Sequence, residues 1–268
     1  MVELRRTVRF CINPPGTSTP PHGSAVNGFG GVPAMSGLGR YYEIDLSCTG
    51  EPDPRTGYLV NIKDIDRAAR AAVIPIIEKA CGDSPTVQPA SIMPTLWRAA
   101  AHALPAPLTR LRWRLTPTYS VEMTTASAQR VVMRQRFDFA AAHRLHTPAL
   151  SEEANRATFG RCNNPSGHGH NYAVEPAVSF DPQAPNPLTL HQLERITHDA
   201  VIDPFDHKHL NKDTPEFAEL GGLNPSVENI ARVFHARLTA AFAQHAPGAR
   251  VESVTVWETD RTSGTFPA

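Results

Sequence analysis

The most informative feature of this sequence is an internal repeat of about half the chain. The segment SGLGRYYEI, which begins at Ser36, is matched 130 positions later by SGHGHNYAV, which begins at Ser166. A second pair of similar segments follows in the two halves, AVIP at 72–75 and AVIDP at 200–204. A repeat at a fixed offset predicts two copies of one structural unit. The alternative is one domain that contains two α+β segments of similar size.

Each half of the chain has the pattern of an α+β unit. Alternation of apolar and polar residues predicts strands, and apolar residues at 3.6-residue spacing predict helices. In each half the predicted order is β-β-α-α-β-β, and the two units are expected to cover residues 1–128 and 129–268. Helices are expected at 61–67, 91–104, 190–196 and 226–242, and closing strands at 111–115 and 254–258. Ser226 is the expected N-cap of the last helix.

Charge and cysteine content narrow the class of protein. Lys and Arg together number 26, as do Asp and Glu, so no net field attracts nucleic acid or an anionic membrane. No apolar run approaches the roughly 20 residues that a membrane span requires, and the first residues predict no signal peptide. The four cysteines are spaced too widely for a zinc knuckle and are too few for a disulfide scaffold. We therefore expect a cytoplasmic protein with reduced thiols.

Three histidines of the second half form a candidate metal site. The residues after Gly167 have the pattern of a strand, so His168 and His170 point to the same face. The segment 137–143 also alternates and ends at His143, which approaches the other two if the strands pair as a hairpin. Three neutral imidazoles with one open position are typical of a catalytic zinc site. The alternative for each is a surface or core histidine.

Further titratable residues lie near this candidate site in the sequence. Cys162 precedes His168 by a short segment, and Asp206 is directly followed by His207 in an expected loop, 203–210. An adjacent carboxylate can hold an imidazole in one tautomer and raise its basicity. Glu258 ends an otherwise apolar strand, where a charge often faces a ligand. The alternatives are that Asp206 caps a turn beside a solvated His207, and that Glu258 reaches water at the rim.

The segments that carry these residues resemble the 6-pyruvoyl-tetrahydropterin synthase family. The resemblance covers about residues 132–262, in order and with compatible gaps. It implies the tunnelling fold, whose β-β-α-α-β-β unit agrees with the pattern above. The matching segments are FAAAHRL at 139–145, CNNPSGHGHNY at 162–172, PFDHKHL at 204–210, NPSVEN at 224–229 and VWET at 256–259.

The resemblance assigns a role to each candidate residue. His143, His168 and His170 would bind Zn²⁺. Cys162 would be the base that moves a proton on the substrate side chain, with Asp206 and His207 completing its relay. Glu258 would accept hydrogen bonds from the amino-pyrimidine edge of a pterin, in a pocket also lined by Ser226 and Glu228. A carboxylate that accepts two N–H bonds suits this planar, guanidine-like edge.

The reaction implied by the resemblance is that of a zinc-dependent lyase. The family eliminates triphosphate from 7,8-dihydroneopterin triphosphate and forms 6-pyruvoyl-tetrahydropterin. A relative, 6-carboxy-tetrahydropterin synthase of queuosine biosynthesis, uses the same substrate and loses the side chain as acetaldehyde. That relative has a shorter cysteine-to-histidine spacing than this chain, which favours the pyruvoyl product. An alternative of another class is a pterin-binding protein without catalysis, against which the presence of Cys162, Asp206 and His207 argues.

The first half lacks the residues that the resemblance requires. Leu38 and Arg40 align with His168 and His170, and Leu115 aligns with Glu258. The first half is therefore expected to be a degenerate tunnelling-fold unit without a metal site. Members of the family assemble with active sites between subunits, so the resemblance also implies a homo-oligomer in which tunnelling-fold units close a barrel.

Overall fold

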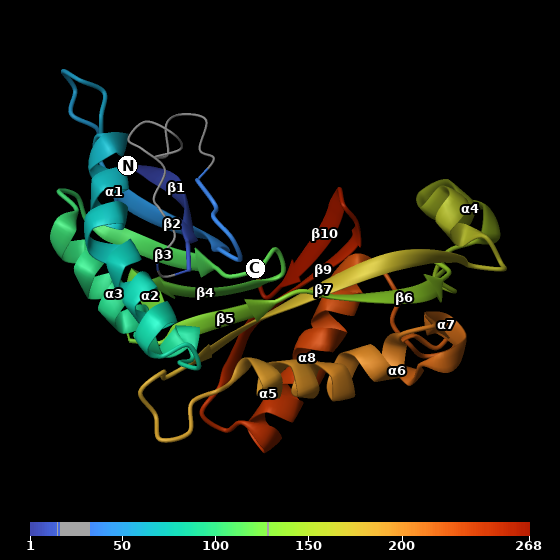
Figure 1. The fold of residues 1–268 in the computed structure, drawn as a ribbon. Coiled ribbons are helices and arrows are strands. Elements are labelled where there is room, and N and C mark those ends of the chain that lie inside the picture. The colour runs from blue at the N-terminus through green and yellow to red at the C-terminus, as the bar shows by residue number, and fades with distance from the viewer. Residues whose placement is uncertain (15, 17–32, 128) are drawn as a thin grey trace. The chain divides into compact units, whose positions relative to one another are not determined.

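The computed structural model describes residues 1–14, 16, 33–127 and 129–268 (Figure 1). The chain divides into two compact units. Unit 1 comprises Met1–Met133 with Asp181–Gln183, and unit 2 comprises Arg134–Phe180 with Ala184–Ala268. Residue 128, at the boundary expected from the sequence, lies outside the described residues. Strand β5 (Val131–Gln135) contains the point at which unit 1 passes into unit 2.

In unit 1, strands β1 to β4 pair antiparallel, and helices cover one face of them (Figure 1). Strand β2 pairs with β1 and β3, and β3 pairs with β4. A π-helical turn, Ala69–Val73, joins α1 to α2. The elements are β1 (Val2–Ile12), β2 (Arg40–Gly50), α1 (Ile62–Ala68), α2 (Ile74–Asp83), α3 (Pro89–Ala103), β3 (Leu108–Arg114) and β4 (Tyr119–Thr124).

Alternation along β2 separates the core of unit 1 from a polar sheet face. Ile44, Leu46 and Cys48 are fully buried, as are Ile77 and Leu96 of the helices. Successive side chains of a strand point to opposite faces, so the residues between these apolar ones form the other face. Burial of the apolar set is the main stabilising contribution to such a layered unit.

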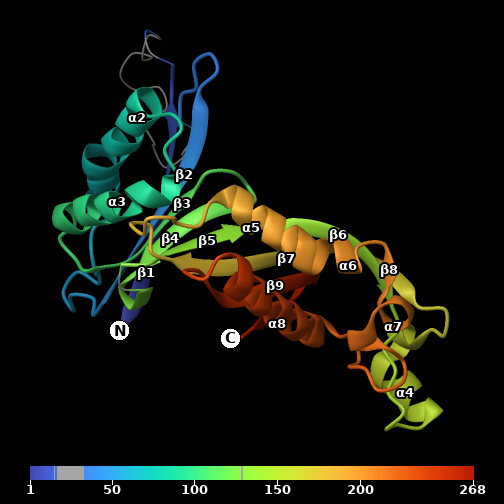
Figure 2. The ribbon, with the colours of Figure 1, turned by 90° about the horizontal axis from the view of Figure 1, so that it is seen from below.

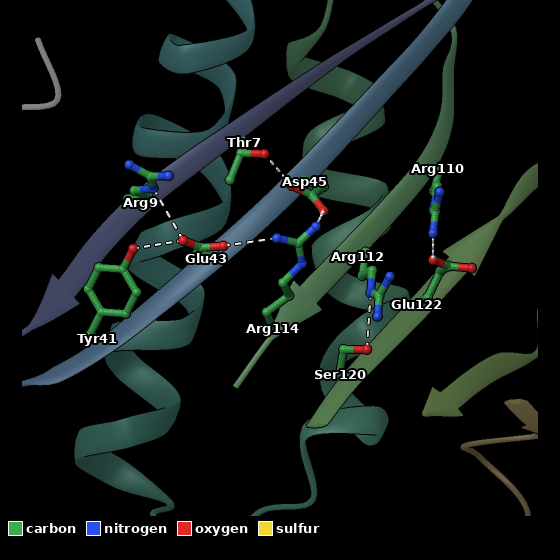
Figure 3. A network of polar contacts seen from close by, with 10 residues as sticks. All are labelled: Thr7, Arg9, Tyr41, Glu43, Asp45, Arg110, Arg112, Arg114, Ser120 and Glu122. Atoms are coloured by element: carbon green, nitrogen blue, oxygen red, sulfur yellow. Dashed lines mark hydrogen bonds and ion pairs between the residues drawn. The ribbon is translucent and has the colours of Figure 1, made fainter. Parts of the chain in front are cut away.

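The second face of the unit 1 sheet carries a network of charged side chains (Figure 3). Arg114 donates to Glu43 at 3.0 Å and to Asp45 at 2.6 Å, and Thr7 donates to Asp45 at 2.6 Å. Burial raises the pKa of Glu43, but hydrogen bonds from Tyr41 and Arg114 outweigh burial and leave this pKa below its ordinary value. The negative charges of Glu43 and Asp45 on this face are therefore balanced by hydrogen bonds from neighbouring side chains.

The strands of unit 2 pair mostly antiparallel, and α5 and α8 lie across one face of them (Figures 1 and 2). Strand β7 pairs with β6 and β9, and β9 pairs with β10. Strand β8 adds to β6 in parallel. The elements are β6 (Phe137–His143), α4 (Glu152–Phe159), β7 (His168–Phe180), α5 (Leu190–Thr197), α6 (Asp203–Phe205), β8 (Lys208–His209), α7 (Leu210–Asp213), α8 (Val227–His245), β9 (Arg250–Thr259) and β10 (Thr262–Phe266).

Helix α8 packs on the sheet of unit 2 through an apolar stripe, as its spacing predicts. Ile230, Phe234 and Leu238 are fully buried, and the Phe234 ring lies 5.6 Å from that of Phe139 on β6. Ser226 is the N-cap, and its hydroxyl accepts a hydrogen bond from the Asn229 N–H at 3.4 Å. The helix therefore begins at Val227, directly after the N-cap that the sequence predicts.

The strands of the two units pair in the same order and in the same register. Ile12 is the partner of Arg40 on β2, and Ala141 is the partner of His170 on β7, at offsets of 129 and 130 residues. Each unit also has a π-helical turn before a proline: Ala69–Val73 precedes Pro75, and His198–Ile202 precedes Pro204. The α+β class with antiparallel sheets is confirmed by the observed strands and helices.

One local element differs from the sequence-based prediction. The segment 203–210, expected to be a loop, instead contains the short helix α6 and strand β8, because its backbone bonds to β6. No helix within the described part of the chain is long and apolar enough to cross a membrane.

Candidate active site

Three imidazoles from the β6–β7 hairpin converge in unit 2. His143 is the direct partner of His168, and His170 faces Ala141 two positions along. One ligand-type nitrogen from each ring lies within 4.8 Å of the others, and the Nε2 atoms of His143 and His168 are 3.2 Å apart. Because these positions alternate on paired strands, the side chains share one face of the sheet.

His143 is held by groups that lie behind it. Its side chain is fully buried, and Nδ1 lies 2.8 Å from the carbonyl oxygen of Pro225 and 3.3 Å from the hydroxyl of Tyr172. Burial lowers the pKa of His143 to about 4, with the neighbouring histidines acting in the same direction. The ring is therefore neutral at pH 7, and a proton on Nδ1 that is donated to Pro225 leaves the Nε2 lone pair facing the cluster.

The donor set of the cluster fits a divalent metal ion. Among the described residues, Nδ1 of His168 and Nε2 of His170 are buried and have no hydrogen-bond partner. Burial also lowers the pKa of His170. Imidazoles that lie this close together can all donate a lone pair to one metal ion. Protonation of one ring, by contrast, would place a positive charge next to the other two. Within the described ranges, this is the group of three or more such residues that could hold a metal.

Glu258, at the end of β9, faces the same cluster. Its Oε1 lies 3.5 Å from Nε2 of His143 and 3.6 Å from Nε2 of His170. The side chain is about one-fifth exposed, so the carboxylate is accessible from solvent. Strand β9 pairs with β7, and Trp257 is the partner of Ala173, which brings the strand end beside His170. A negative charge on the open side of the cluster is thus available to a cation or to a ligand N–H.

Cys162 lies in a short 3₁₀ turn, Gly160–Asn163, between α4 and β7. Its carbonyl oxygen accepts a hydrogen bond from the Leu145 N–H at 2.8 Å, which ties the turn to the end of β6. Burial raises the pKa of the Cys162 thiol, and the charge of Glu258 raises it further. The thiol is therefore close enough to Glu258 to sense its charge, and it is protonated unless a cation is nearby.

Asp206 and His207 form a hydrogen-bonded pair directly before β8. Oδ2 of Asp206 lies 2.8 Å from Nδ1 of His207, and Oδ1 accepts a hydrogen bond from the Ala140 N–H at 2.8 Å. That hydrogen bond, with those to His207, lowers the pKa of Asp206. The His207 side chain is 83% exposed, and its backbone has a positive φ of 56°. The pair is therefore oriented by β6 but points to solvent.

Ser226 and Glu228 lie in the first turn of α8, next to the carbonyl of Pro225 that holds His143. A hydrogen bond from Ser226 lowers the pKa of Glu228, so the carboxylate is ionised at pH 7. Gly264 on β10 packs against this turn, and a Cβ there would lie 3.3 Å from the carbonyl carbon of Val227. The turn is thus fixed between β10 and the histidine cluster.

In unit 1 the corresponding positions offer no imidazole. The matching residues Pro14, Leu38 and Arg40 line a pocket of about 580 Å³. Tyr42 occupies the place of Tyr172, and its hydroxyl and the Cys81 thiol raise the pKa of Arg40, with Cys81 the larger cause. The described residues that line this pocket include none of the three nitrogen donors.

Comparisons with known proteins agree with the arrangement in unit 2. The family model described as 6-pyruvoyl tetrahydropterin synthase matches residues 132–267, half of the chain. The chain belongs to this family. The matched range contains the histidine cluster, Cys162, the Asp206–His207 pair and Glu258.

Curated relatives of this family span a wide range of organisms. The 6-pyruvoyl tetrahydrobiopterin synthase of Poecilia reticulata is 37% identical over 125 residues, which are 46% of this chain and 80% of that protein. The human protein of the same name is 41% identical over 99 residues, which are 36% of this chain and 66% of that protein. The chain is accordingly an enzyme, a lyase of the 6-pyruvoyl tetrahydropterin synthase type.

The chain is also similar to a solved structure. The 6-pyruvoyl tetrahydropterin synthase of Caenorhabditis elegans has 32% sequence identity with this chain and a TM-score of 0.45. That comparison covers 51% of this chain and 94% of the other.

Some residues of the site were not predicted from the sequence. The Pro225 carbonyl and the Tyr172 hydroxyl both contact His143. The contact of the Pro225 carbonyl with His143 could not have been predicted from the sequence, because every residue has a backbone carbonyl. Tyr172 was within reach of sequence analysis, because it lies two positions beyond His170 and therefore on the same face.

Proposed function

We propose that unit 2 is a zinc-dependent lyase that acts on 7,8-dihydroneopterin triphosphate, eliminates triphosphate and forms 6-pyruvoyl-tetrahydropterin. The observation that carries this proposal is the convergence of His143, His168 and His170 beside Glu258 and the Cys162 turn. The family to which the chain belongs supplies the reaction class, and these residues supply the chemistry that the reaction requires.

His143, His168 and His170 would hold the zinc ion through neutral imidazole nitrogens. When bound, zinc supplies a Lewis acid that makes the hydroxyl groups and adjacent C–H bonds of a bound side chain more acidic. The Pro225 carbonyl would keep the proton of His143 on Nδ1 and so direct Nε2 to the ion. Burial lowers the pKa of His143 to about 4 and also lowers the pKa of His170, so protonation of these two rings competes less with the metal.

Cys162 would be the base that moves a proton on the substrate side chain. Its pKa is raised by burial and by Glu258, so it needs a nearby cation to become a thiolate at neutral pH. Asp206 would hold His207 in one tautomer, with the proton on Nδ1 and Nε2 free to exchange protons with the thiol. Because His207 points to solvent, we propose that the relay is completed at an interface in a homo-oligomer.

The pterin ring would be recognised by carboxylates. We propose that Glu258 accepts two N–H bonds from the amino-pyrimidine edge, and that Ser226 and Glu228 line the same pocket. Glu258 lies on the open side of the cluster, and Glu228 is ionised next to Pro225. Charge-assisted hydrogen bonds from a planar donor edge to a carboxylate are shorter and stronger than neutral ones.

The wider proposal concerns the whole chain. We propose that both units are tunnelling-fold units from a tandem duplication, that unit 1 is a scaffold without a metal, and that units close a barrel in the assembly. The shared strand register and the paired π-helical turns support the duplication. On the sequence argument from its four widely spaced cysteines, we propose the cytoplasm as the compartment.

A second product is a specific alternative. The 6-carboxy-tetrahydropterin synthase reaction of queuosine biosynthesis starts from the same substrate and releases acetaldehyde. Purified protein incubated with dihydroneopterin triphosphate and Zn²⁺ distinguishes the products by mass. A pyruvoyl pterin with free triphosphate supports the proposal, acetaldehyde with a carboxy pterin supports the alternative, and no turnover at any metal loading leaves a pterin-binding protein.

Substitutions separate the base from the metal ligands. We expect Cys162→Ala to abolish turnover while the protein retains zinc, and His168→Ala to lose zinc and turnover together. Cys81→Ala is the matched control, because Cys81 is also a half-buried free thiol but lies in unit 1. Full activity in Cys162→Ala would show that the assignment of the base is wrong, whatever the metal content.

A further inference from the structure

A fourth histidine, His209, contacts the turn that presents a metal-site imidazole. It lies on β8, where it is the partner of Ala142, the residue before His143. Its backbone N–H donates a hydrogen bond to Oδ2 of Asp213 at 2.7 Å, which fixes the strand that carries it. His209 is therefore tied to β6 by pairing and to α7 by a hydrogen bond, two residues after His207.

The contact is made at Gly167, the residue before His168. Gly167 has a φ of +72°, and its N–H donates a hydrogen bond to the carbonyl of Asn164 at 2.8 Å. A Cβ added at Gly167 would lie 2.6 Å from Nε2 of His209 and 3.0 Å from the carbonyl oxygen of His143. The imidazole of His209 thus packs directly against the backbone of this turn, next to the backbone of His143.

The ring of His209 has no hydrogen bond that accounts for its position. Both ring nitrogens are buried, and neither has a partner among the residues that the structure describes. Since an unpartnered polar ring gains nothing from hydrogen bonding there, its contribution in this structure comes from the space that it fills. That space is bounded by Gly167 and by the His143 backbone, so the ring limits how far the His168 turn can move.

We propose that His209 is a positioning residue of the metal centre, which holds the Gly167 turn and thereby the imidazole of His168 in the geometry that a metal ion requires. This inference rests on the proposed metal-binding function of the three histidines. It also connects two parts of the proposed mechanism, because the Asp206–His207 pair directly precedes β8, which carries His209. The segment that orients the relay is then the segment that orients a ligand.

The test measures metal affinity rather than turnover. Zn²⁺ affinity is determined by competition with a chromophoric chelator for the wild type, His209→Ala and His209→Leu. Removal of a group that orients a ligand typically weakens metal binding about 10- to 100-fold, so we expect this loss in His209→Ala. Leu fills a similar volume without nitrogens, so His209→Leu should bind within about threefold of the wild type. His191→Ala, an exposed histidine of the same unit, is the control.

A double-mutant cycle with Gly167→Ala isolates the contact. The added methyl group meets His209 in the wild type but not in His209→Ala, while the backbone strain at positive φ is the same in both backgrounds. We expect Gly167→Ala to weaken Zn²⁺ binding less in the His209→Ala background, by at least about threefold. The visible spectrum of the Co²⁺-loaded protein should shift in His209→Ala and return in His209→Leu.

The outcomes distinguish this inference from the function on which it rests. A wild type that binds neither Zn²⁺ nor Co²⁺ would overturn the metal site itself. A wild type that binds metal, with unchanged affinity and spectrum in His209→Ala and additive effects in the cycle, would overturn the role of His209 alone. Circular dichroism at the assay temperature establishes that each variant is folded. If His209→Ala does not fold, His209→Val, which removes less of the ring volume, takes its place, and unchanged Zn²⁺ affinity and Co²⁺ spectrum in that variant would overturn the role of His209.

Discussion

At the scale of single residues, the histidine cluster depends on groups that are not its members. Alternation predicted that His168 and His170 share a face, and the pairing of His143 with His168 agrees with the hairpin argument. The carbonyl of Pro225 then fixes the ring of His143. That contact joins residues 82 positions apart and involves only backbone on one side, so no side-chain pattern could have predicted it.

Asp206 gives a prediction of pH-dependent stability. Its Oδ1 accepts from the Ala140 N–H, and that hydrogen bond is the main reason that the pKa of Asp206 lies below its ordinary value. The stabilisation should be fully present above the unfolded pKa of about 3.9 and be lost as pH falls through the lower folded value. We expect Asp206→Ala to lower the free energy of unfolding by about 1 kcal/mol at pH 7.

Urea unfolding at pH 7 and near pH 2.5 measures this difference. The gap between wild type and Asp206→Ala should be smaller at the lower pH, because protonation of the carboxylate progressively removes the stabilisation as pH falls toward the folded pKa. Asp260→Ala is the control, since the side chain of Asp260 is 90% exposed. A gap that is equal at both pH values would contradict the assignment of the stabilisation to the charged form.

At the scale of elements, long periodic segments were predictable and short ones were not. The stripe of Ile230, Phe234 and Leu238 predicted α8, and Ser226 predicted its start. The two-residue strand β8 was expected to be a loop, because its pairing with Ala141 and Ala142 is set by tertiary contact. The π-helical turn at His198–Ile202 adds a residue to a helix without changing its apolar spacing enough to be recognised.

The N-cap of α8 offers a prediction about this helix. The Ser226 hydroxyl accepts from the Asn229 N–H, and replacement of such a cap by alanine lowers stability by about 1 kcal/mol. We expect Ser226→Ala to show this loss in chemical unfolding and Ser226→Asp, which can also cap, to show little of it. Equal losses in both variants would mean that the hydroxyl contributes by another route.

The charged network on the unit 1 sheet gives a prediction about a buried ion pair. Arg114 bonds to Glu43 and to Asp45, and the Asp45 side chain is only 2% exposed (Figure 3). Removal of this cation leaves the buried Asp45 carboxylate with weaker compensation, from Thr7 among its partners, so Arg114→Ala should lower the unfolding free energy by about 3 kcal/mol. Arg55→Ala, which breaks an exposed pair with Asp53, should lower it by less than about 1 kcal/mol. Thermal unfolding of the two variants measures this difference. A similar loss of stability in both would contradict this account.

At the scale of the whole molecule, the two units share a fold pattern but differ in donors. Unit 1 has Leu38 and Arg40 where unit 2 has His168 and His170. We therefore expect one Zn²⁺ ion per 29.2 kDa chain, measured by elemental analysis of protein dialysed against a metal buffer. Saturating metal should raise the unfolding temperature, and a chelator should reverse the rise. Two ions per chain, or one ion retained in His168→Ala, would contradict the assignment of the site to unit 2.

The paired π-helical turns carry a consequence for the history of the chain. Each is a one-residue insertion in a helix, and each lies directly before the equivalent proline, Pro75 or Pro204. Under the proposed duplication, an insertion that arose afterwards would be present in one copy only. The insertion is then older than the duplication, and the loss of the histidines from unit 1 is younger. On that proposal the ancestor would be a single unit that already had the bulged helix and the three histidines, and we expect relatives that have only one unit to retain that bulge.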